Sequence, residues 1–162
     1  MRIEYENKWF RVLKDGKYHY LQENGSDNGA VVLALIDGCF IFVQVQRAAQ
    51  GMELIEAPRG YGNPGELSED CALRELFEET GHCFDKEDLQ LLGNIRPNSA
   101  ILSSCIPVYL IETAAREPLK APDGEVTTLV SIDKDAVKSV VAQGKITDGI
   151  TLAALALYWS RN

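Results

Sequence analysis

The chain of 162 residues has few basic side chains, with 16 Lys and Arg against 24 Asp and Glu and a formal net charge of −8. Proteins that bind nucleic acid in general neutralise phosphates with Lys and Arg, so this balance argues against nucleic acid as a partner. A phosphorylated small molecule is not excluded, because local cations or metal ions can offset the charge. The length suits a single compact domain.

Paired cysteines and long apolar runs are also missing. The four cysteines stand apart without a Cys-x-x-Cys pair, which argues against a zinc site. The longest apolar runs, such as AVVLALI and LAALALYW, are too short to cross a bilayer. We expect no signal peptide, because no basic segment followed by an apolar run stands at the start of the sequence. We therefore expect a cytoplasmic protein with no membrane partner.

The first half of the chain is typical of strands joined by tight turns. WFRVLK and KYHYLQ flank Asp15-Gly16, and AVVLALI and CFIFVQVQR flank Asp37-Gly38. Asp-Gly between two such runs is a strong signal for a β-hairpin. Further strands are predicted over residues 53–57, 89–95, 105–114 and 126–132.

Three helices are predicted. Ser68 is a suitable N-cap for a helix that ends at Gly81, a suitable C-cap residue. A second helix is expected from about residue 135 to 144, and a third begins near residue 147 or 148. The combination predicts an α/β fold, with a mixed, mainly antiparallel sheet flanked by helices.

Three glutamates gather on the first helix. Glu75, Glu78 and Glu79 are related by i,i+3 and i,i+4, so they share one face. Like charges at this spacing destabilise a helix by roughly 0.2–0.5 kcal/mol per pair. The helix alone leaves two interpretations open: a solvated acidic face, or a site for Mg²⁺ or Mn²⁺ whose carboxylate ligands repel one another until the metal binds.

The flanking residues favour the metal site. Gly60 is followed after five residues by Glu66 and after seven more by RELFEETG, residues 74–81. This spacing resembles the Nudix box, the signature of the Nudix hydrolase family, and the resemblance spans residues 60–82. It departs from the pattern only at His82, where the family has an aliphatic residue. The resemblance implies the Nudix fold, an α/β/α sandwich, for one domain over residues 1–162.

This resemblance implies an enzyme that hydrolyses a nucleoside diphosphate linked to another group, with Mg²⁺ as cofactor and Mn²⁺ as a substitute. By position in the motif, Glu75 and Glu79 are direct metal ligands. Glu78 is a third ligand or holds a metal-bound water. In some relatives a box glutamate, here Glu78 or Glu79, also serves as the general base.

Other residues of the motif are implied to support the metal. The backbone carbonyl of Arg59 or of Gly60 often completes the site in relatives. Arg74 and Glu66 are implied to form a pair that orients the loop and the ligating glutamates.

In the ADP-ribose pyrophosphatases of this family, the base is often an acid on a loop well beyond the box. The matching loop here is REPLKAPDGEV, with Glu117, Asp123 and Glu125. We favour Glu125. An acidic turn at Asp123-Gly124 explains each of these residues equally well when taken singly.

Three features resemble the ADP-ribose and nucleotide-sugar branch. Pro97 lies where that branch carries a proline near the substrate, although a strand terminator explains it equally well. Arg47 ends VQVQR, like an arginine that reaches the phosphates or ribose, and its alternative is a solvated strand end. APRGYG resembles the loop of this branch, which makes Arg59 and Glu56 candidate substrate contacts; an edge-of-strand glutamate is the safer interpretation of Glu56.

The resemblance predicts hydrolysis of ADP-ribose or a nucleotide sugar. One alternative is a Nudix hydrolase of dinucleoside polyphosphates or nucleoside triphosphates, and Pro97 leans against it. Another is a module that senses ADP-ribose without cleaving it, and the retained box acids argue against that. Relatives in this branch are usually homodimers that contact through N-terminal strands, so residues 1–28 are the expected dimerisation element.

Overall fold

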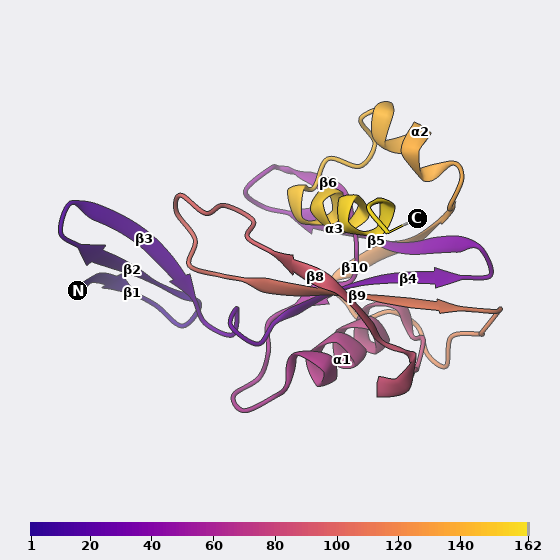
Figure 1. Cartoon of the computed structure of the whole chain (residues 1–162), viewed down its shortest axis with the longest axis horizontal. Coiled ribbons are helices and arrows are strands. Elements are labelled where there is room, and N and C mark those ends of the chain that lie inside the picture. The colour runs from indigo at the N-terminus through magenta and orange to yellow at the C-terminus, as the bar shows by residue number, and fades with distance from the viewer. Residues whose placement is uncertain (162) are drawn as a thin grey trace.

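The computed structural model describes residues 1–161. The N-terminal segment forms an antiparallel sheet of its own, which projects from one end of the molecule in Figure 1. Its strands are β1 (Arg2–Glu6), β2 (Phe10–Asp15) and β3 (Tyr18–Glu23). The hairpin predicted around Asp15-Gly16 is confirmed as β2 and β3. Strand β1 is additional, and its sequence RIEYE alternates polar and apolar residues, as a strand does.

Seven strands form the central sheet. They are β4 (Ala30–Ile36), β5 (Cys39–Arg47), β6 (Met52–Glu56), β7 (Arg59–Gly60), β8 (Gln90–Ile95), β9 (Ile106–Thr113) and β10 (Val126–Asp133). The order is β10-β5-β4-β9-β8, with β6 paired to β5 and β7 paired to β4. Strands β4 and β9 run parallel, and the other pairs are antiparallel. The predicted mixed, mainly antiparallel sheet is confirmed.

Strand β4 lies at the centre of the molecule, and all seven of its residues are buried. Successive side chains of a strand point to opposite faces. Val31, Leu33 and Leu35 therefore enter one core cluster, whereas the alternate residues of β4 enter a second cluster on the other face. An apolar run without alternation is what a strand covered on both faces requires.

Helices cover the two faces of this sheet (Figure 1). Helix α1 (Ser68–Thr80) packs on one face, and α3 (Gly149–Trp159) packs on the other, next to the short α2 (Val137–Ala142). A 3₁₀ turn, η1 (Lys86–Asp88), follows α1. The α/β/α sandwich is confirmed. No helix in the described residues is long and apolar enough to cross a membrane.

The helix ends correct one prediction. Leu67, not Ser68, is the N-cap of α1, and it makes no side-chain capping bond. The Ser68 hydroxyl instead lies 2.7 Å from the Tyr109 hydroxyl, which fixes the start of the helix against strand β9. Gly81 ends α1 with φ of 77°, as predicted, and Asp148 caps α3 by accepting a hydrogen bond from the Thr151 amide.

Candidate active site

The candidate site lies along α1 and the loop that precedes it. Arg74 is the hub of its hydrogen bonds. The Arg74 guanidinium donates to both carboxylate oxygens of Glu66 at 2.9 Å, to Glu75 at 2.6 Å and to Glu78 at 3.1 Å, and it also binds the Tyr61 carbonyl oxygen. The structure thus brings together Arg74 and Glu66, and Arg74 lowers the pKa of Glu66 through this bond. The pair fastens the loop to the helix.

Gly60, at the end of β7, is needed because of Glu75. A Cβ atom at Gly60 would lie 2.1 Å from the Cδ atom of Glu75, far inside van der Waals contact. The Glu75 carboxylate therefore rests directly on the backbone of β7. Burial raises its pKa, and the bond from Arg74 opposes that shift. Any side chain at position 60 would displace this carboxylate.

Glu79 is the most buried acid of the box, with 7% of its surface exposed. Its carboxylate accepts a hydrogen bond from the Arg59 backbone amide at 3.1 Å. Burial raises the pKa of Glu79 to about 8, and the nearby charges of Glu75 and Asp123 add to the effect. A buried carboxylate with so little compensation is unfavourable, and a cation beside it would remove the cost.

The acids of α1 fit a hard divalent cation. Within the described part of the chain, no three acidic, His or Cys side chains converge into a ready-made cage, because Arg74 holds Glu75 and Glu78 while the Arg59 amide holds Glu79. The donor set is nevertheless made of carboxylate oxygens, the ligands that Mg²⁺ and Mn²⁺ prefer. On binding a metal, these glutamates would release the Arg74 guanidinium or the Arg59 amide and bind the metal in its place.

A cleft of about 270 Å³ opens over these acids. It joins three parts of the chain: the β5 and β7 ends, helix α1, and the loop between β9 and β10. The lining residues are Arg47, Arg59, Gly60, Tyr61, Glu75, Glu78, Glu79, Asp123 and Glu125. The cleft is therefore lined by both carboxylates and arginine side chains, a combination suited to a metal-bound polyphosphate.

The arginines of the cleft are held from behind by a buried acid. Glu56 is 1% exposed, and its carboxylate accepts two hydrogen bonds from Arg47, at 2.7 and 2.6 Å, and one from Arg59 at 2.7 Å. The bond to Glu56 raises the pKa of Arg47, so the guanidinium stays charged. In this arrangement Glu56 orients the arginines instead of facing the cleft itself.

Two other predicted residues lie outside the cleft. Pro97 lines a smaller neighbouring pocket, with Tyr61 and Leu102 among its walls. Glu117 lies beside Cys83 in a separate hollow beyond the end of α1. Of the three acids proposed as the base, the structure brings Asp123 and Glu125 to the cleft and leaves Glu117 away from it.

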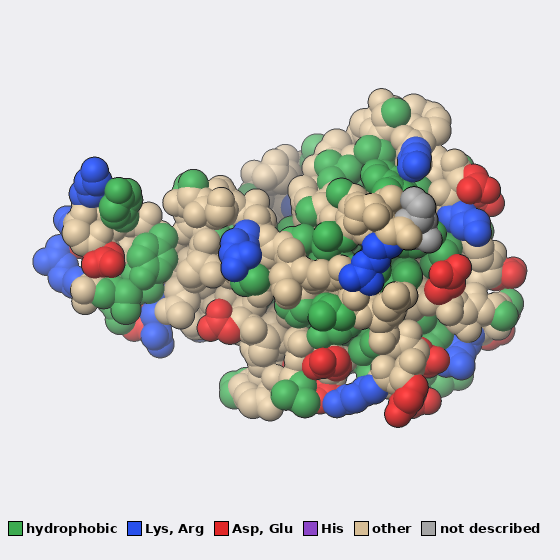
Figure 2. Space-filling view, in the orientation of Figure 1, with side chains coloured by type: hydrophobic (Ala, Val, Ile, Leu, Met, Phe, Trp, Pro, Cys, Tyr) green, Lys and Arg blue, Asp and Glu red, His purple; other side chains and the backbone are tan. Residues whose placement is uncertain are grey.

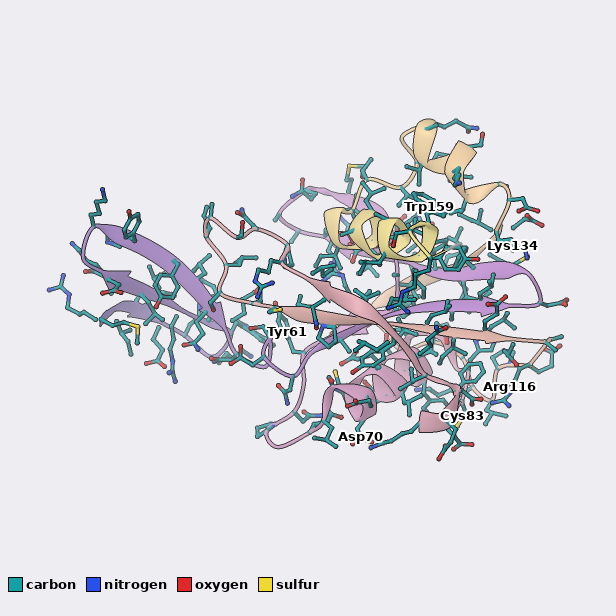
Figure 3. All side chains as sticks on the ribbon, viewed as in Figure 1. Tyr61, Asp70, Cys83, Arg116, Lys134 and Trp159 are labelled. Atoms are coloured by element: carbon teal, nitrogen blue, oxygen red, sulfur yellow. The ribbon has the colours of Figure 1, made fainter. Side chains whose placement is uncertain are left out.

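Tyr61 and Asp148 are parts of the site that the sequence did not indicate. Tyr61, labelled in Figure 3, lines both the cleft and its neighbour. Its hydroxyl donates to Glu23 of β3 at 2.8 Å. Asp148 lies 3.7 Å from the Arg59 guanidinium. Its sequence position marked it only as a helix start, since the contact with Arg59 joins segments far apart in the chain.

Residues 27–148 match the family model of the NUDIX domain. The chain belongs to the Nudix family. Its Nudix box departs from the pattern at His82, which is buried, accepts or donates a hydrogen bond at 3.1 Å to the Thr80 hydroxyl, and stacks against Phe84. A polar ring thus fills an apolar position, with its Nδ1 atom hydrogen-bonded.

The Nudix fold is also seen by comparison with a solved structure described as an ADP compounds hydrolase. That structure superposes with a TM-score of 0.74 over 98% of this chain and 89% of the other, at 18% sequence identity. At this identity the likeness establishes the fold. Together with the family match, it confirms the predicted Nudix assignment, and the chain is a Nudix hydrolase.

Proposed function

We propose that this Nudix hydrolase cleaves the pyrophosphate bond of ADP-ribose or a related nucleotide sugar, with Mg²⁺ as cofactor and Mn²⁺ as a substitute. The observation that carries the proposal is the cleft that Arg47 and Arg59 line together with the acids of α1. Arginines suit phosphate oxygens, whereas carboxylates suit the cations that accompany a polyphosphate. The similarity to a hydrolase of ADP compounds supports an ADP moiety.

Each box residue then has a distinct task. Glu75 and Glu79 hold the cation, with the Arg59 carbonyl as a further oxygen ligand, and Glu78 is a third ligand or orients a water. The cation would neutralise charge on the phosphate oxygens and lower the pKa of a nearby water. Arg47 and Arg59 bind the phosphates, and Glu56 keeps both guanidinium groups in place.

The base is proposed to be Glu125. Its side chain is exposed at the cleft, and no described residue donates a hydrogen bond to its carboxylate. Asp123 is less free, because its Oδ1 atom already accepts the Glu125 amide at 3.0 Å. Glu125 would accept a proton from water as the oxygen attacks phosphorus and the bridging P–O bond breaks. With ADP-ribose, the products would be AMP and ribose 5-phosphate.

We also propose a homodimer formed through residues 1–28 and a cytoplasmic location. The exposed apolar side chains of the N-terminal sheet support the dimer. All four cysteines are free, as expected in a reducing compartment.

A substrate screen tests the function. Purified protein is incubated with ADP-ribose, nucleotide sugars, dinucleoside polyphosphates and nucleoside triphosphates, with Mg²⁺, Mn²⁺ or EDTA, and the products are separated by chromatography. We expect ADP-ribose or a nucleotide sugar to be cleaved fastest, and only with metal. Glu79→Gln should lower turnover by roughly 10²-fold or more, whereas Glu69→Gln, at the other end of α1, should not. Tight binding of ADP-ribose without any turnover would contradict the proposal.

A further inference from the structure

The loop over residues 114–125, between β9 and β10, is docked on the C-terminal end of α1. The Leu119 amide donates to the Gly81 carbonyl at 2.8 Å, and the Asp123 amide donates to the Glu78 carbonyl at 2.9 Å. The last carbonyl groups of a helix have no partner within the helix. The loop supplies two of those partners, so the end of the Nudix box and the acid loop share hydrogen bonds.

Side chains reinforce this contact. Lys120 lies over the ring of Phe77 of α1, with its Nζ atom 4.6 Å from the ring centre. Arg116 lies over the ring of Phe84 at the same distance and donates to the Cys83 carbonyl at 2.7 Å. Figure 3 shows Arg116 and Cys83 close together beyond α1. Cation–π contacts of this kind contribute about 0.5–1 kcal/mol each at exposed sites.

At Gly81 the loop lies very close to the end of the helix. A Cβ atom there would lie 2.0 Å from the Lys120 carbonyl oxygen and 3.2 Å from the Cβ atom of Pro118. The first neighbour is backbone, so it cannot turn aside. Gly144, which follows α2 with a similar φ of 71°, has no atom within 4 Å of a built Cβ. Both glycines thus have a left-handed backbone conformation, but only Gly81 lies against atoms of another segment.

The docked loop carries the acids that complete the cleft. Asp123 and Glu125 reach the cleft from this loop, whereas Glu75 and Glu79 reach it from α1. The contact at Gly81 therefore joins the two segments that carry these acids. We propose that Gly81 and Lys120 are positioning residues, which hold the acid loop against α1 so that Glu125 is placed over the box glutamates. The catalytic part of this inference rests on the proposed function.

Amide hydrogen exchange tests the docking without any need for activity. Asparagine tolerates the left-handed region, so Gly81→Asn introduces a side chain with little backbone penalty, and Gly144→Asn is the matched control. In Gly81→Asn we expect the amides of Leu119 and Asp123 to exchange at least about tenfold faster. In Gly144→Asn they should exchange as in the wild type. Unchanged protection in Gly81→Asn would overturn the docking.

Lys120 provides a second variant that leaves the helix end intact. Lys120→Met removes the cation above Phe77, and Lys120→Arg keeps it. If the loop positions the base, Gly81→Asn should lower kcat by roughly 10- to 100-fold with little change in KM, and should alter the acidic limb of the kcat–pH profile. Lys120→Met should lower kcat by about 2- to 5-fold, the size that one exposed cation–π contact supports. Lys120→Arg should restore most of the rate.

The two proposals fail in different ways. A wild-type protein that turns over no nucleotide would contradict the proposed function, while the exchange of Leu119 and Asp123 would still decide the docking. Gly81→Asn could instead exchange both amides faster and yet keep the wild-type kcat and pH profile. That result would show that the docked loop does not position the base, and it would overturn this inference.

Discussion

At the residue scale, Glu79 shows how a candidate cation site lowers the stability of the metal-free protein. The residue is nearly buried, and the Arg59 amide hydrogen bond only partly offsets its charge. Its pKa is raised from 4.5 to about 8. Between these values the folded protein retains a proton that the unfolded chain has released. The free energy of unfolding therefore falls as the pH rises from about 4.5 to about 8.

Replacing Glu79 by Gln should remove this pH-dependent cost. Without metal at pH 8, Glu79→Gln should be more stable than the wild type by roughly 1–3 kcal/mol, since the amide keeps the bond from Arg59 but adds buried donors. The difference should shrink toward pH 4.5. Urea unfolding in EDTA at several pH values measures it.

Magnesium should reverse the order of stability. A ligand that binds only the native state stabilises it, and the wild type should gain more from Mg²⁺ than Glu79→Gln does. Glu69→Gln serves as the control for the loss of one charge from α1. A wild type and a Glu79→Gln variant that stay equally stable across the pH range would show that Glu79 does not carry this cost.

At the element scale, helix α3 is tied to the residue that follows strand β6, just before the Nudix box. The Asp148 carboxylate accepts bonds from the Thr151 amide and, at 2.7 Å, from the Thr151 hydroxyl. That hydroxyl in turn accepts the Ala57 amide at 2.9 Å. Thr151 is fully buried, so the chain of bonds is shielded from water. It places the start of α3 beside Arg59.

Thr151→Val should break this tie while keeping the shape of the side chain. The Ala57 amide would then be buried without an acceptor, which costs about 1–3 kcal/mol. Chemical denaturation should show a loss of that size, with an unchanged dependence on denaturant. Thr147→Val, at an exposed position just before the helix, should change stability little. A similar loss in both variants would argue against the buried bond.

The element scale also shows what the sequence can predict. Both Asp-Gly hairpins follow from local turn signals, and the end of α1 at Gly81 and the start of α3 at Asp148 follow from local capping signals, because such signals lie within a few residues of the element they bound. Strand β7, with two residues, carries no periodic signal, and its existence depends on pairing with β4. The choice of Leu67 over Ser68 as N-cap depends on Tyr109, 41 residues away.

The same distinction between local signals and distant contacts applies to the candidate site. The box acids are recognisable because their spacing lies within one helix and its loop. Glu56 and Arg47 are both predicted to contact substrate. Nothing in the residues around them indicates that they form an ion pair with each other. The contact of Asp148 with Arg59 joins residues even farther apart. Long-range electrostatics thus escaped prediction, whereas local spacing did not.

At the scale of the whole molecule, the N-terminal sheet stands apart from the sandwich (Figure 1). A three-stranded sheet needs an apolar face packed on something to be stable. Every residue of β1 is exposed, and large apolar side chains remain uncovered on this sheet and its turns (Figure 2). They are Met1, Ile3, Tyr5, Trp9 and Tyr18. This surface is what a second copy of the chain would cover.

The proposed dimer predicts the molecular mass of the protein in solution. Sedimentation equilibrium of the wild type should give twice the chain mass of 17.9 kDa. Replacing Ile3 and Tyr5 together by Lys puts two charges into the proposed interface, where desolvating unpaired charge is unfavourable, so the variant should sediment as a monomer. The same change at Leu91, which is equally exposed but lies on β8, should leave the dimer intact. A wild type that stays monomeric at micromolar concentration, or a double variant that still dimerises, would mean that the sheet serves some other contact.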